Sequence, residues 1–134
     1  MEQDTIVLIL LHILVTFFIV LIPLLFEKMP PKDINMIYGY RTKRSMKNLD
    51  TWKVANSFSA KLLRGLTVIL VTIQLPLFFI CSPPMSLLWT SIAWVIGLFM
   101  VIYRTEQYLK KTFDQEGNRS VSYTHLTLPT KRIV

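Results

Sequence analysis

Polar, aromatic and glycine residues gather between residues 38 and 56, and their types suit binding rather than catalysis. Arg41 and Arg44 carry guanidinium groups, which donate paired hydrogen bonds to phosphates, carboxylates or backbone carbonyls. Gly39 stands between two tyrosines and predicts a bend in the backbone. We call residues 38–56 the motif segment. Its candidate site residues are Tyr38, Gly39, Tyr40, Arg41, Thr42, Arg44, Ser45, Asn48, Trp52 and Asn56.

Asn48, Trp52 and Asn56 recur at every fourth position, so they share one face wherever this part of the chain is helical. Two interpretations of the motif segment stay open. Tyr, Trp and Arg side chains at a membrane edge commonly anchor a protein, and Asn side chains commonly cap helices or crosslink neighbouring segments. In the other interpretation, the motif segment contacts a partner or a lipid headgroup directly.

His12 and Gln74 are polar residues inside apolar stretches, where hydrocarbon leaves a polar group without a partner unless another residue or water supplies one. Counted from the outer helix ends, His12 lies about 9 Å deep and Gln74 about 10 Å deep. We therefore expect the two side chains to share a depth at which they can hydrogen-bond. The hydroxyls expected nearby are those of Thr16, Thr72, Thr90 and Ser91. This pair either joins the helices or receives an extracellular peptide or ion.

Residues that could support catalysis are sparse. No Ser or Cys has a plausible paired base, and no pair of carboxylates lies within an apolar stretch. A single cysteine, Cys81, and two histidines make a structural metal centre improbable. Glu106 and Lys110 are spaced as an ordinary i,i+4 ion pair of a helix. We expect neither enzymatic activity nor a cofactor nor a metal site.

The elements that position these residues are predicted to be membrane helices. The 134 residues are 52% hydrophobic and 17% charged, which is too apolar for a soluble domain of this size. Charge-free stretches predict three transmembrane helices at about 6–26, 62–81 and 85–103, joined first by a loop over 27–61 and then by a tight turn at Pro83 and Pro84. The fold class is therefore an all-α integral membrane protein that contacts the lipid bilayer.

Positive charge predicts the orientation of these helices. Nine Lys and Arg residues lie in 27–64 and four in 104–119, whereas the N-terminus and the turn at 82–86 hold none. Because cations favour the cytoplasmic side, the basic loop and the C-terminus are predicted to be cytoplasmic and the N-terminus outside. The net charge of +7 then reflects loops that face an anionic leaflet, and we expect no nucleic-acid partner. Asp50 is predicted to cap the second helix, with Trp52 at headgroup depth.

Residues 120–134 are predicted to be foreign to the natural protein. Val121 to Thr130 reads VSYTHLTLPT and resembles, without a gap, the translated transposase end and adapter of sequencing libraries. The alternative is a genuine short tail. On either interpretation the segment is too short and polar to build a packed unit. Without its two cations, 13 Lys and Arg stand against 8 Asp and Glu, a net charge of +5.

The motif segment, with Tyr38-Gly39-Tyr40-Arg41-Thr42 at its start, resembles the signature of the SdpI family of bacterial membrane proteins. The resemblance extends from the first apolar stretch to about residue 119, although some members carry additional N-terminal spans. It implies a multi-pass protein of the bacterial plasma membrane that gives immunity to a secreted antimicrobial peptide toxin. Two alternatives are a signalling anchor that holds a soluble regulator through the basic loop, and a subunit of a small transporter formed as a homo-oligomer.

Overall fold

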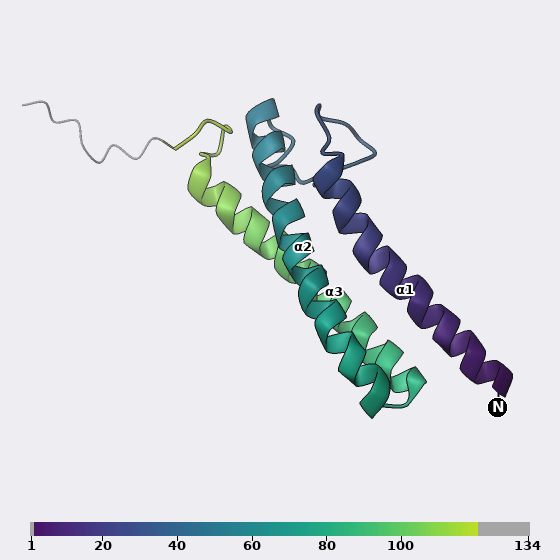
Figure 1. The fold of residues 1–134 in the computed structure, drawn as a ribbon. Coiled ribbons are helices and arrows are strands. Elements are labelled where there is room, and N and C mark those ends of the chain that lie inside the picture. Colours follow the sequence, from purple (N-terminus) through teal and green to yellow (C-terminus); the bar gives the residue numbers. More distant parts are fainter. Residues whose placement is uncertain (1, 121–134) are drawn as a thin grey trace, which may run out of the picture.

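The computed structural model describes residues 2–120 and contains three long helices (Figure 1). These are α1 (Glu2–Lys28), α2 (Leu49–Ile80) and α3 (Pro83–Thr112). Each is long and apolar enough to cross a membrane, which confirms the predicted all-α membrane fold with three spans. The segment interpreted as adapter-derived, 121–134, lies outside the described residues.

The three helices run antiparallel to their neighbours in the chain, with α2 packed closely on α3 and α1 packed mainly on α2 (Figure 1). The start of α1 therefore lies at the same end as the turn between α2 and α3, which we call the turn end. The loop 29–48 and residues 113–120 meet at the opposite end, which we call the basic end. Which of the two ends faces the cytoplasm stays a prediction.

The helices α2 and α3 extend further at the basic end than the apolar stretches predicted. α2 begins at Leu49, within two residues of the cap predicted at Asp50 and well before the apolar stretch at 62, and α3 ends at Thr112 rather than near residue 103. The loop between α1 and α2 therefore covers 29–48 instead of 27–61. Hydropathy detects only the turns that lie in hydrocarbon, whereas the extra turns are held by contacts within the protein. Where the extra turns of α2 meet its apolar stretch, Arg64 of α2 pairs with Glu27 of α1.

Most large apolar side chains of the three helices point outward, as expected where lipid is the solvent. The buried positions between the helices include many small or hydroxyl-bearing side chains, which let the backbones approach closely. Gly97 of α3 shows how close this approach is, because a Cβ placed there would overlap Cδ1 of Leu66 on α2. Close packing and hydrogen bonds between the helices hold the fold together, with a small buried apolar cluster of Ala55, Leu109 and Phe113 at the basic end.

Candidate functional site

Asn56 and Trp52 fasten the loop onto the first turns of α2. The amide oxygen of Asn56 accepts a hydrogen bond from the backbone N–H of Tyr40 at 2.6 Å, and its Nδ2 donates to the carbonyl of Trp52 at 2.9 Å. The indole Nε1 of Trp52 donates to the carbonyl of Pro31 at 3.1 Å. Trp52 is fully buried, so its side chain packs inside the protein, and its predicted place at headgroup depth stays a prediction.

Gly39 allows the loop to pass directly over these two side chains. Its φ is +112°, a value that L-residues rarely adopt, in keeping with the bend predicted there. A Cβ at this position would lie 2.6 Å from the amide oxygen of Asn56 and 2.8 Å from Cγ of Pro31. Only glycine fits between the loop and α2.

Asn48, rather than the predicted Asp50, is the N-cap of α2. Its side-chain oxygen accepts from the backbone N–H of Thr51 at 2.9 Å, and the Thr51 hydroxyl accepts in return from the Asn48 N–H at 3.1 Å. The Nδ2 of Asn48 also donates to the carbonyl of Gly117 at 2.7 Å. Asp50 lies in the first helical turn and pairs with Arg119 at 2.7 and 2.8 Å. The start of α2 is therefore tied to the segment that follows α3.

The two functions of Asn48 can be separated by substitution. Asn48→Ala removes the cap and the bond to Gly117, and it is expected to lower the free energy of unfolding by about 1–2 kcal/mol. Asn48→Ser keeps a capping oxygen and loses only the bond to Gly117, so a smaller decrease is expected. Denaturant titration in detergent, followed by tryptophan fluorescence, measures both. Equal losses in the two variants would contradict a capping function.

Glu106 on α3 contacts the motif segment, although its spacing from Lys110 predicts an ion pair within the helix. Its carboxylate accepts hydrogen bonds from the hydroxyl of Thr42 at 2.7 Å and from that of Tyr40 at 3.1 Å, and it lies 3.7 Å from Nε of Arg44. It therefore faces the motif segment, not Lys110. The available signal was an acidic residue just beyond the third apolar stretch in a protein whose loop is rich in arginine.

The Tyr40 hydroxyl shares its single proton between this carboxylate and the backbone carbonyl of Ile102 on α3, which lies 3.2 Å away. Burial, and then the nearby negative charge of Glu106, raise the pKa of Tyr40 well above its ordinary value of 10.0. In the folded protein this phenol therefore keeps its proton at pH values where the unfolded chain loses it.

This pKa shift predicts a loss of stability at alkaline pH. A group with a raised folded-state pKa contributes stability that is complete below its unfolded-state pKa and is lost as the pH rises through the folded-state value. Tyr40→Phe is therefore expected to be less stable than the wild type below pH 10, with a gap that narrows at higher pH. Denaturant titrations from pH 8 to 11 measure it. Tyr103→Phe, at an exposed tyrosine of α3, is the control, and a gap independent of pH would contradict the assignment.

The remaining residues of the motif segment divide into bonded and unbonded groups. The Tyr38 hydroxyl shares its single proton between the carbonyls of Leu25 and Met29, at 3.1 and 2.8 Å, at the end of α1. The hydroxyl of Ser45 is buried and donates to the carbonyl of Tyr40 at 2.9 Å. Arg41 is exposed and makes no hydrogen bond or ion pair with the described part of the chain. The motif segment is thus largely bonded within the protein, and Arg41 is left facing outward.

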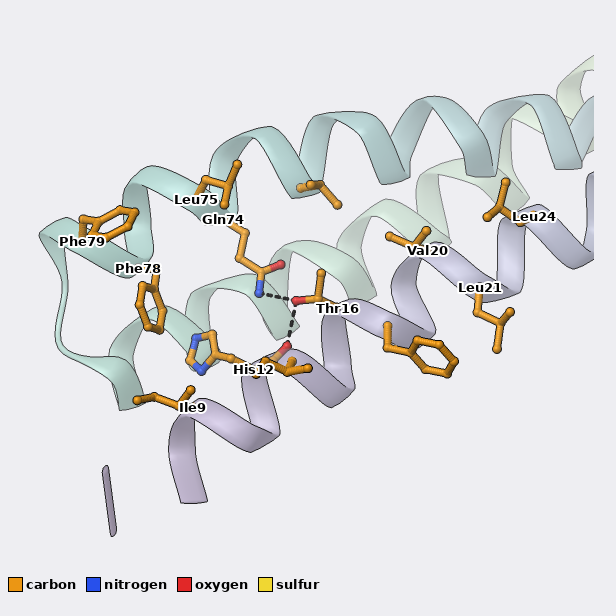
Figure 2. A pocket seen from close by; sticks show the side chains of 13 residues that line it. Ile9, His12, Thr16, Val20, Leu21, Leu24, Gln74, Leu75, Phe78 and Phe79 are labelled. Carbon is orange, nitrogen blue, oxygen red and sulfur yellow. Dashed lines mark hydrogen bonds between the residues drawn. The ribbon is translucent and has the colours of Figure 1, made fainter. Parts of the chain in front are cut away.

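At the turn end, His12 and Gln74 lie in one layer but are linked through Thr16 rather than directly (Figure 2). Nε2 of Gln74 donates to the Thr16 hydroxyl at 2.7 Å, and that hydroxyl donates to the backbone carbonyl of His12 at 2.7 Å. Nε2 of the His12 ring lies 3.2 Å from the hydroxyl of Ser86 on α3. The layer therefore joins all three helices.

The other hydroxyls expected in this layer bond to their own helices. Thr72 and Ser91 are exposed and donate to the carbonyls four residues before them, and Thr90 is buried and donates to that of Ser86. Their hydroxyls satisfy the backbone instead of joining the relay between His12 and Gln74.

A groove of about 720 Å³ opens between α1 and α2 beside this layer (Figure 2). His12, Thr16 and Gln74 contribute its polar groups, and the rest of its lining is apolar. The apolar lining residues are Ile9, Ile13, Phe17, Val20, Leu21, Leu24, Val71, Leu75, Phe78 and Phe79. The amide oxygen of Gln74 is buried without a hydrogen-bond partner among the described residues. A groove of this kind suits an apolar ligand that carries few polar groups.

In residues 2–120, no three His, Cys, Asp or Glu side chains come together closely enough to hold a metal ion.

The candidate site has two parts. One is the bonded basic end, with Arg41 exposed beside it, and the other is the groove at the turn end.

Comparisons with known proteins place the chain in a family. The model of the SdpI/YfhL protein family matches residues 32–104, which include the whole motif segment and Gln74. The Uncharacterized protein YfhL of Bacillus subtilis (strain 168) is 36% identical over 107 residues, covering 72% of this chain and 84% of the relative. No solved structure matches. With three membrane-spanning helices and a family match over more than half of its length, the chain is a multi-pass membrane protein of the SdpI/YfhL family.

Proposed function

We propose that the protein gives immunity to a secreted antimicrobial peptide at the bacterial plasma membrane, without catalysing a reaction. The resemblance of the motif segment to the SdpI signature carries this proposal, because that resemblance implies immunity, and the family match over residues 32–104 supports the resemblance. The groove at the turn end supports it, since an apolar site open to the lipid suits a peptide that attacks from within the membrane.

The division between the two ends fits this function. The basic end is fastened by hydrogen bonds from the loop to α1, α2 and α3, which hold the helices at one side of the membrane. At the turn end, His12, Thr16 and Ser86 supply the polar contacts described above between α1 and its neighbours. With the turn end outside, an incoming peptide reaches first the end at which His12, Gln74 and the groove lie.

A survival assay tests the proposal. A peptide-sensitive bacterium that expresses the full chain is challenged with a panel of secreted antimicrobial peptides, beside cells that carry the empty vector. We expect a higher inhibitory concentration for at least one peptide of the panel. Well-inserted protein that shifts none of these concentrations would contradict immunity toward that panel.

The proposed orientation has its own test by cysteine labelling. The background variant Cys81→Ser carries either Ser82→Cys at the turn end or Lys47→Cys at the basic end, and both positions are exposed. A membrane-impermeant maleimide is expected to label the first in intact cells and the second only after permeabilisation. Labelling of the Lys47→Cys variant in intact cells would show the opposite orientation, with the basic end outside.

A second function, that of a signalling anchor for a soluble regulator, is supported by the exposed cations of the loop. Arg41, Lys43 and Lys47 are all exposed, and Arg41 has no partner in the described residues. An acidic surface of a regulator would find these groups ready to pair. Co-purification of a soluble protein that depends on Arg41, measured with Arg41→Ala, would favour this function, whereas Arg41→Ala with full binding would exclude Arg41 from it.

A further inference from the structure

We infer that the groove between α1 and α2 binds an apolar helical segment of the secreted peptide, with a hydrogen-bond donor of that segment at the level of Gln74. The inference rests on the proposed function and names its ligand site. Gln74 is only 7% exposed, and its amide belongs to the chain of hydrogen bonds that runs through Thr16 to the carbonyl of His12.

Hydroxyl chemistry fixes the orientation of the Gln74 amide. The Thr16 hydroxyl has a single proton, and it lies 2.7 Å from the carbonyl of His12, which can only accept. Thr16 must therefore accept the hydrogen bond from Gln74, which requires the amide nitrogen on that side. The amide oxygen is consequently the atom left without a partner.

Both ring nitrogens of His12 already have partners. Nδ1 lies 3.1 Å from the carbonyl of Leu8, which can only accept, so this nitrogen carries a proton. Nε2 lies 3.2 Å from the hydroxyl of Ser86, and the ring packs edge-on with Phe78 at 5.5 Å between centroids. The Gln74 oxygen is the one buried side-chain polar atom in the described residues that lacks a partner.

The unpaired amide oxygen of Gln74 favours an occupant of the groove that carries a hydrogen-bond donor. Lipid acyl chains fill an apolar groove but carry no donor, so they leave the oxygen unpaired at a cost in free energy. A helix with a serine, threonine or asparagine supplies the donor and pairs its own backbone. Along α1 the groove extends from Ile9 to Leu24, about 22 Å, which is the length of a four-turn helical segment. Gln74 lines the groove, and its oxygen is buried in the wall while the amide nitrogen stays bonded to Thr16, so the donor must enter the wall beside Gln74 to reach it.

Photo-crosslinking in vesicles tests the inference with a defined probe. Benzoylphenylalanine replaces Leu75, which lines the groove and is exposed, in the full chain. The vesicles contain phosphatidylethanolamine and phosphatidylglycerol, with a 19-residue Leu/Ala helix that carries one central serine, or its twin with alanine. We expect the serine peptide to crosslink about three to ten times more efficiently, the size of one hydrogen bond in a membrane. The same crosslinker at Val95 of α3, outside the groove, is expected to show no preference.

Matched variants separate the groove from the rest of the surface. Gln74→Leu is expected to abolish the preference for serine, whereas Thr72→Val, at an exposed threonine of the same helix, retains it. Val71→Trp fills the groove and is expected to abolish crosslinking, whereas Val68→Trp, on an exposed part of α2, retains it. Near-wild-type helix content by circular dichroism shows that each variant folds. Crosslinks only to phospholipid, or only to a second copy of the chain, would overturn the inference.

The survival assay distinguishes failure of this inference from failure of the proposed function. If the wild type protects and Val71→Trp protects equally well, immunity stands and the groove is not its peptide site. If the serine peptide binds as expected and no peptide of the panel is resisted, the groove stands as a helix-binding site and immunity fails. Loss of protection in Val71→Trp together with its retention in Val68→Trp supports both.

Discussion

Trp52→Ala is expected to lower the free energy of unfolding by about 3–5 kcal/mol, the largest effect of any single truncation of a side chain in this protein. Trp52 is the largest of the fully buried side chains, and it packs beneath the loop where Gly39 passes. Removing the indole leaves a cavity and strips the carbonyl of Pro31 of its donor. Because Trp52 also presents its backbone carbonyl to Asn56, the loosening reaches the contact that holds Tyr40.

Two further variants divide this loss into its causes. Trp52→Phe keeps most of the ring and loses only the bond to Pro31, so its cost is expected to be about 1–3 kcal/mol. Trp89→Ala removes an exposed tryptophan of α3 and is expected to change stability little. Denaturant titration in detergent, followed by circular dichroism, measures all three. A loss below about 1 kcal/mol in Trp52→Ala would mean that the loop repacks into the space and is not held by this side chain.

The three spans could be predicted because hydrocarbon imposes a requirement that sequence shows directly. A stretch of about twenty residues without charge crosses a bilayer only as a helix. Pro83 and Pro84, which begin α3, leave room only for a short turn after α2. The ends at the basic side could not be predicted in this way. The first turns of α2 mix polar and apolar residues, and they are helical because Asn48 caps them and Trp52 packs inside the protein.

The partners of the polar residues were harder to predict than their positions. Helix length gives the depth of His12 and Gln74, but it does not give the direction in which each side chain leaves its helix. That direction places Thr16 between them. Glu106 shows the same limit, because its spacing from Lys110 suits an ion pair while the packing of α2 on α3 turns it toward Tyr40 and Thr42.

The motif segment illustrates how residue types can indicate a site without indicating its use. Arginines, tyrosines and asparagines at a membrane edge suit both anchoring and ligand binding. The structure directs most of them to internal partners, such as the pairing of Arg44 with Glu106. Arg41 is the exception among them, and a function in partner binding rests on it.

Gly39→Ala is expected to destabilise the protein by at least about 2 kcal/mol, although it adds only one methyl group. A φ of +112° strains any L-residue, which costs about 1–3 kcal/mol. The new Cβ would also lie 2.6 Å from the amide oxygen of Asn56, which already accepts from the N–H of Tyr40. To relieve this contact the loop must lift from α2, and the pairing of Tyr40 and Thr42 with Glu106 weakens with it.

Gly65→Ala provides the opposite expectation within the same protein. Gly65 lies inside α2, and a Cβ there would meet nothing within 4 Å, so alanine is expected to stabilise the helix by about 0.5–1 kcal/mol. Thermal unfolding of both variants in the same detergent gives the comparison. If Gly39→Ala were tolerated as well as Gly65→Ala, the loop would not be held against Trp52 and Asn56, and the basic end could not fasten the three helices. If only Gly39→Ala unfolds early and also loses protection against the peptide, immunity depends on that fastening, although Gly39 itself touches no ligand.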